Sequence, residues 1–176
     1  LSRGLGDVYK RQGEWGRFLQ WRNATPFGIT DPQFGLDVSF YTFELPFLRF
    51  LLGFAFAATF IALALGVVVH YLFGGLRLQP KGDRATTAAQ VQISITVAIF
   101  LFLKAIAYWL DRYDLVIQSS DLAGGFTGLQ YTDVNAKLPA LNILTFVALL
   151  VGLLFLLNAF RRQWIFPLIG LGLMVL

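Results

Sequence analysis

The sequence predicts an all-α protein, a polytopic bundle of transmembrane helices with four spans, and two observations support this fold class. Hydrophobic residues make up 57% of the chain and charged residues only 14%, whereas soluble domains contain about 25% charged residues. The apolar residues also form long uninterrupted blocks, and the longest blocks reach the ~20 residues that cross a bilayer as a helix. Too little polar surface remains to cover a water-soluble globule.

Two of the four spans are clear. Residues 50–69 carry no charge, and we expect a helix over 45–73 around them. Residues 138–160 are also uncharged, and Arg161 and Arg162 end this block abruptly. At a rise of ~1.5 Å per residue, each block covers the ~30 Å of a hydrocarbon core. Each block therefore predicts one transmembrane helix.

The other two spans are less complete. We expect a second helix over 85–110, although polar side chains interrupt it, and a fourth, truncated span over 164–176. Residues 1–12 resemble a non-native leader produced by a sequencing artefact, so they do not enter the fold prediction. The polar residues that interrupt 85–110 are Gln90, Gln92, Ser94, Thr96 and Lys104.

The charges of the connecting segments predict the orientation. Segment 74–84 and the turn 161–163 are basic, which places them in the cytoplasm by the positive-inside rule. Segments 13–44 and 111–137 carry more acidic than basic residues and are expected outside, the first as a structured segment at the outer membrane surface. The four segments alternate in sign, as four successive crossings require.

One stripe of the second helix is polar. Steps of three and four residues place Gln90, Ser94 and Lys104 on the same face, and Lys104 lies at about the depth of Asn142 on the third helix. A charge inside a membrane is costly, so one interpretation is a substrate or ion site at these four residues. The alternative is a lysine that extends its ammonium group to the outer surface, where Asp111 or a loop carboxylate caps it.

The segment 111–137 offers the most polar groups to a partner. Asp111, Asp114, Tyr131 and Asp133 are the residues that we expect to contact a partner outside the membrane. Aspartates in this number also suit a hard cation such as Ca²⁺, but their spacing does not match a calcium-binding loop, and we predict no metal site. Asp111, Asp114 or Asp133 are candidate acids or bases, but no paired catalytic geometry is visible and we assign no catalytic residue.

Other kinds of site are excluded by residue types. The chain has no cysteine and one histidine, which excludes disulfides, thiolate metal sites and typical zinc sites. The net charge of +4 does not indicate nucleic-acid binding, because the basic residues stand at the ends of apolar blocks. We expect no cofactor.

Three strings resemble a known family. They are FGITDPQFGLDVSFYTFELPF at 27–47, YWLDRYDLV at 108–116 and GLQYTDVNAKLPAL at 128–141. Together they resemble uncharacterised protein family 0182, large bacterial integral membrane proteins, over essentially all of 13–176. The resemblance implies about seven N-terminal spans followed by a large extracytoplasmic domain, with this chain as a fragment that holds the fourth to seventh spans. It implies no activity.

Three functions stay open at this point. The preferred one is a non-enzymatic membrane anchor or envelope-assembly component of the bacterial plasma (inner) membrane. The second is a transporter or channel with a polar site on the second helix, and the third is a membrane-embedded enzyme that acts on a lipid-linked substrate. The expected partners are the lipid bilayer, the remaining spans and extracytoplasmic domain of the full-length protein, and envelope proteins.

Overall fold

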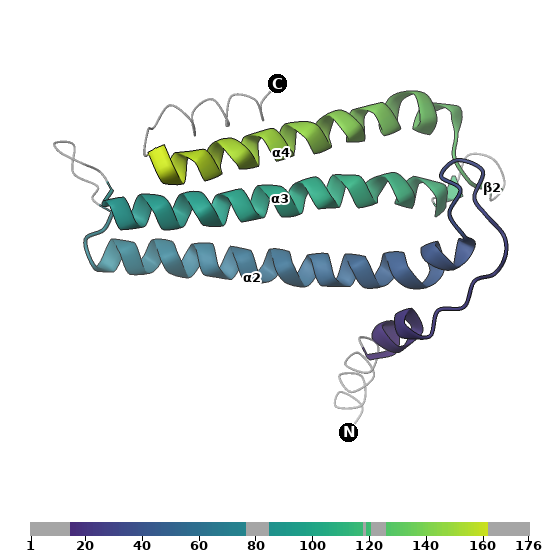
Figure 1. Cartoon of the computed structure of the whole chain (residues 1–176), viewed down its shortest axis with the longest axis horizontal. Helices are drawn as coiled ribbons and strands as arrows, with labels where there is room; N and C mark the ends of the chain where they lie inside the picture. The colour runs from purple at the N-terminus through teal and green to yellow at the C-terminus, as the bar shows by residue number, and fades with distance from the viewer. Residues whose placement is uncertain (1–14, 77–84, 118, 121–125, 162–176) are drawn as a thin grey trace. The chain divides into compact units, whose positions relative to one another are not determined.

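The computed structural model describes residues 15–76, 85–117, 119–120 and 126–161, and most of them are helical (Figure 1). This confirms the all-α prediction. A short helix covers residues 15–22. The expected leader 1–12 and the expected truncated span 164–176 lie outside the described residues. The main elements are the π-helix η1 (Phe40–Glu44), α2 (Leu45–Leu72), α3 (Thr87–Ile117), the antiparallel pair β1 (Ser119–Ser120) and β2 (Phe126–Thr127), the π-helix η3 (Asp133–Lys137) and α4 (Leu138–Arg161).

Three helices in the described residues are long and apolar enough to cross a membrane. They are the continuous helical segments Phe40–Leu72, Thr87–Ile117 and Asp133–Arg161, with 33, 31 and 29 residues. Since about 20 residues suffice to cross a hydrocarbon core, each helix is longer than a crossing requires.

Two of these helices begin with a π-helical turn because of a proline. Inside an α-helix, the proline ring clashes with the carbonyl group four residues earlier. For Pro46 that residue is Thr42, within η1, and for Pro139 it is Asn135, within η3. The wider π-turn makes room for the ring. The helices thus begin before the expected starts at 45 and 138.

The second helix is longer than its predicted range of 85–110, because α3 continues to Ile117. Residues 111–117 contain neither glycine nor proline, so nothing in the sequence ends the helix at 110. Asp111 and Asp114, which we assigned to a loop, therefore lie on the last turns of α3. The same correction applies to Asp133, which begins η3.

The chain divides into two compact units. The first unit combines Leu1–Leu51 with Tyr113–Leu129, and the second combines Leu52–Arg112 with Gln130–Leu176. The helices α2 and α3 each contribute residues to both units.

In the second unit, α3 lies between α2 and α4 (Figure 1). A third of the apolar window of α3 is buried, against 6% for α2 and 17% for α4. Gly152 of α4 permits a close approach to α3, because a Cβ atom there would lie 3.0 Å from the Phe102 ring. On the other side, Phe56 of α2 contacts Phe100 edge-on, with the ring centroids 5.1 Å apart. Of the three described long helices, α3, which carries the polar stripe, is thus the most enclosed.

Candidate functional site

Asp37 folds the segment that precedes η1. Its carboxylate accepts hydrogen bonds from the backbone N–H groups of Phe27 (3.0 Å), Gly28 (2.8 Å) and Ser39 (2.8 Å). These bonds, above all the bond from Ser39, lower the pKa of Asp37 to about 2, because they stabilise the charged form. Asp37 is therefore ionised at neutral pH and ties the two ends of the segment together.

Asp31 closes the turn between those two ends. Its Oδ2 atom accepts hydrogen bonds from the backbone N–H groups of Gln33 (3.1 Å) and Phe34 (2.7 Å), which is the usual way for aspartate to start a turn. The Tyr41 hydroxyl donates to the same oxygen at 3.3 Å. Gly35, with a φ of 67°, provides the left-handed residue that completes the turn. Both Asp31 and Tyr41 are buried, so this turn has a small core of its own.

The turn packs on the last part of α3 through aromatic rings. Tyr113 is buried, and the rings of Phe34 and Phe40 contact it edge-on with centroid separations of 5.0 and 5.2 Å. Next to Tyr113 on the chain, the Asp114 carboxylate forms an ion pair with the Arg49 guanidinium of α2. Among the described residues, these ring contacts and the Arg49–Asp114 ion pair hold the first unit together.

Arg49 has a different role from the one that its position in the sequence suggests. An arginine one turn inside an apolar helix is expected to extend toward the membrane surface. Instead it is paired with Asp114, and each of the two side chains is about one-third exposed. The sequence does not predict this pairing, because it places Asp114 in a loop rather than on α3.

The four residues expected to contact an outside partner have separate environments. Asp114 pairs with Arg49 in the first unit. Asp133 is buried, accepts a bond from the Gln130 N–H at 3.0 Å and forms an ion pair with Lys137 at 2.7 Å, so it holds the start of η3. Tyr131 is 82% exposed and therefore available to a partner, whereas Asp111 is half-buried.

The polar stripe of α3 is used for helix contacts. Ser94 Oγ accepts a hydrogen bond from Asn158 Nδ2 of α4 at 2.8 Å, and both side chains are buried. Asn142 Oδ1 accepts a bond from Arg112 Nη1 at 2.9 Å. Lys104 Nζ lies 4.7 Å from the centroid of the Tyr108 ring one turn further along α3. These three members of the predicted site thus each contact a residue outside the predicted set, and Gln90 is half-buried.

The sequence does not predict the roles of Asn158 and Arg112 in these contacts. An amide inside an uncharged apolar block is a signal for an interhelical hydrogen bond, and Asn158 could have been found in this way. Arg112 was counted as a loop charge, because the helix was expected to end at Leu110. Among the described residues, no three acidic, histidine or cysteine side chains lie together as metal ligands.

The fold and its polar contacts define a helical protein with three potential membrane spans in the described residues and a folded segment at one end of α2. A family model described as Uncharacterised protein family (UPF0182) matches residues 4–176. The chain therefore belongs to the UPF0182 family, as its three strings predict.

Curated relatives agree. The chain is 52% identical to a UPF0182 protein of Streptomyces coelicolor and 51% identical to one of Thermobifida fusca, over 93% of this chain in each case and 17% and 16% of those proteins. A UPF0182 protein of Frankia alni is 47% identical over 98% of this chain and 17% of its own length. The chain thus spans about one-sixth of the length of these relatives. No solved structure matches it significantly.

Proposed function

We propose that this chain is part of an integral membrane protein of the bacterial plasma (inner) membrane and that it anchors an extracytoplasmic surface on which an envelope component assembles. The membrane location is supported by the three long apolar helices. In the proposed orientation, segments 13–44 and 111–137 lie outside, and segments 74–84 and 161–163 lie in the cytoplasm. This orientation is proposed because lysines and arginines concentrate in the two cytoplasmic segments.

The observation that carries the proposal is the folded segment 27–41. Asp37 and Asp31 accept five backbone N–H bonds within it. Such a framework fixes the side chains that it leaves exposed, among them Ile29, which is 65% exposed. An ordered surface with exposed apolar side chains suits recognition of a partner, since little order must be gained on binding.

The polar contacts between α3 and α4 favour an anchor over a transporter. A transport path needs polar groups along the depth of the membrane. Ser94 and Arg112 of α3 each form a side-chain hydrogen bond with α4, and they lie eighteen positions apart, which is ~27 Å along the helix. Between them, Phe102 packs closely against Gly152. This arrangement supports two interhelical hydrogen bonds that hold α3 and α4 together, with an apolar contact between them.

Site-specific photo-crosslinking in the full-length protein tests the proposed surface. A benzophenone amino acid at Ile29 or Tyr131 is expected to form a discrete adduct with another envelope protein in living cells. A benzophenone at Ile143, an exposed apolar position of α4, is the matched control for contacts within the membrane. The Ile29 adduct is expected to disappear in Asp37→Ala, which removes three hydrogen bonds to the backbone of the segment, and to persist in Lys104→Leu.

Two further results decide between the alternatives. If no protein adduct forms at Ile29 or Tyr131, the anchor proposal is wrong. If flux into liposomes is measured for the full-length protein and Lys104→Leu abolishes it, the transporter alternative replaces it. Cysteine labelling at positions 77, 121 and 161 tests the orientation, because this chain has no cysteine of its own and impermeant reagents should reach only position 121.

A further inference from the structure

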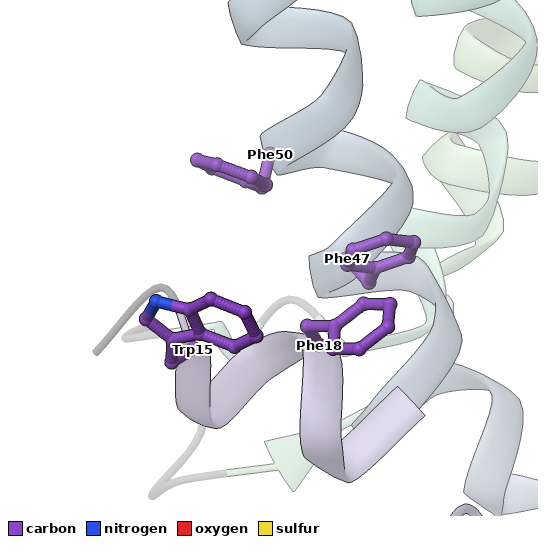
Figure 2. Close-up of a pocket in the computed structure, with 4 residues that line it drawn as sticks. All are labelled: Trp15, Phe18, Phe47 and Phe50. Atoms are coloured by element: carbon purple, nitrogen blue, oxygen red, sulfur yellow. The ribbon is translucent and has the colours of Figure 1, made fainter. Parts of the chain in front are cut away.

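An apolar pocket lies in the first unit between the helix over residues 15–22 and the first turns of α2. Trp15 and Phe18 of the short helix and Phe47 and Phe50 of α2 line it (Figure 2). The volume is about 350 Å³. Trp15 is 70% exposed, so the pocket is open on one side.

The short helix is attached to α2 by ring contacts beside this pocket. Trp21 stacks on Phe47 with a centroid separation of 4.6 Å and an interplanar angle of 17°. The ring centroids of Phe18 and Phe47 are 6.0 Å apart. Trp15 in turn contacts Phe18 edge-on at 6.1 Å. The lining is therefore built from aromatic rings that hold one another in place.

The chemistry of the lining selects a hydrocarbon occupant. Ligand pockets measure about 300–1,000 Å³ and usually include polar groups that orient a polar ligand. The four lining residues in the described part of the chain are aromatic, three of them phenylalanines. The volume suits a segment of a chain better than a whole lipid. An acyl chain meets both conditions.

The position of the pocket indicates where the hydrocarbon comes from. Phe50 begins the uncharged run 50–69, so in the proposed orientation the pocket opens at the boundary between headgroups and acyl chains. The charged residues of the short helix, Arg17 and Arg22, are both basic. Arginines at this level attract anionic headgroups.

We propose that this pocket holds the upper part of one acyl chain of an anionic phospholipid of the outer leaflet, with the phosphate close to the arginines of the short helix. The lipid then attaches the 15–22 helix to the membrane surface and to α2. This inference rests on the proposed membrane location, and the experiment separates the two.

The test uses the full-length protein in lipid nanodiscs that contain phosphatidylglycerol with a diazirine near the top of one acyl chain. After irradiation and trypsin digestion, the adducts are located by mass spectrometry. Cleavage after Arg17 and Arg22 releases residues 18–22, and cleavage after Lys137 and Arg161 releases α4 as residues 138–161. The first peptide reports the pocket and the second reports bulk lipid.

We expect labelling of 18–22 to saturate at a low fraction of photolipid, near one lipid per protein, while labelling of 138–161 rises in proportion to it. The double substitution Trp15→Ala with Phe18→Ala should reduce labelling of the first peptide at least fivefold and leave α4 unchanged. Phe18→Leu, which keeps the pocket apolar and filled, should retain saturable labelling. Unchanged α4 labelling in the double variant shows that its loss of pocket labelling is not due to failed insertion.

Headgroup preference is measured by competition with unlabelled phosphatidylglycerol or phosphatidylcholine. One arginine near a membrane surface favours an anionic lipid by about fivefold. Arg22→Gln should remove about that factor. Because this substitution also removes a trypsin site, the adduct is then sought on the peptide of residues 18–49. Equal competition by both lipids in the unsubstituted protein contradicts the role of the arginines.

The remaining outcomes overturn one proposal or the other. If α4 is labelled but 18–22 is labelled only in proportion to photolipid, or not at all, another part of the protein covers the pocket and the lipid site is wrong. If neither peptide is labelled, the helices are not in the membrane and the proposed location fails first.

Discussion

Removal of the Asn158 side chain is the most direct perturbation of the contact between α3 and α4. Asn158 Nδ2 donates to Ser94 Oγ at 2.8 Å, and the two residues are 1% and 4% exposed. In lipid, burial of apolar surface gives no net drive for helix association, so packing and interhelical hydrogen bonds hold the helices together. We therefore expect Asn158→Ala to weaken the helix pair more than an apolar substitution of similar size does.

The magnitude follows from the burial of both groups. A neutral hydrogen bond contributes about 0.5–1.5 kcal/mol to stability, and interhelical bonds in a membrane protein average about 0.6 kcal/mol with a maximum near 1.7. Full burial of both partners favours the upper half of this range. Ser94 alone can turn its hydroxyl to a carbonyl of its own helix, which reduces the cost of losing Asn158. We expect a coupling energy of about 1 kcal/mol.

The assay is a double-mutant cycle on the free energy of unfolding of the purified chain in detergent, measured by helical circular dichroism during titration with SDS. The cycle contains Asn158→Ala, Ser94→Ala and the double variant, and its coupling energy isolates the bond. Thr96→Val is the matched control, because the Thr96 hydroxyl bonds to the Gln92 carbonyl of its own helix at 2.8 Å. A coupling energy below ~0.3 kcal/mol, within the additivity of independent sites, would refute the reasoning.

Two further predictions concern the first unit. The Arg49–Asp114 ion pair is partly screened by solvent, since each side chain is about one-third exposed. Exposed ion pairs contribute up to ~1 kcal/mol to stability, and breaking a buried pair costs ~3–5 kcal/mol. A double-mutant cycle of Arg49→Leu and Asp114→Leu should therefore give a coupling energy of ~1–2 kcal/mol, and additive effects would show that the pair does not form. The Asp37 carboxyl should titrate near pH 2 by carbon NMR. Because its pKa is lower in the folded state than the usual 3.8, its stabilising effect is present above about pH 4 and is lost as the pH falls toward 2. Asp37→Asn should abolish this pH dependence, measured as proteolysis of segment 27–41, and an unchanged profile would contradict the assignment.

The long apolar helices could be predicted from the sequence because a hydrocarbon core would impose one requirement, the absence of charge, on every residue of a block. Residues 50–69 and 138–160 meet it without a charge, so two helices follow from length and composition alone. The weaker second helix was also expected, although its end was placed too early at 110. Asp111 and Arg112 suggest a water-exposed loop. Charged residues can nevertheless continue a helix past the hydrocarbon core where their side chains find partners, and α3 continues to Ile117.

The polar contacts were harder to predict because they depend on how each helix is rotated about its axis. Periodicity placed Ser94 and Lys104 on one stripe, but it did not show which α4 residue lies opposite. Asn158 takes that place for Ser94, whereas Lys104 contacts Tyr108 on its own helix. The Asp31 turn was partly readable, since Asp-Pro followed by glycine marks a turn, but its packing on Tyr113 requires the tertiary structure.

The close approach of α3 and α4 at Gly152 allows both interhelical hydrogen bonds, Asn158–Ser94 and Arg112–Asn142, to form together. A Cβ atom at Gly152 would lie 3.0 Å from the Phe102 ring, so a larger side chain requires the ring or the helices to shift. Gly152→Val should therefore weaken both the Asn158–Ser94 and the Arg112–Asn142 bonds and lower the SDS midpoint by more than the loss of either bond alone. Gly53→Val in α2 is the control, because a Cβ atom there meets no atom within 4 Å. If the two valine variants unfold at the same SDS concentration, Gly152 does not set the distance between α3 and α4. The two interhelical hydrogen bonds then do not depend on this close approach.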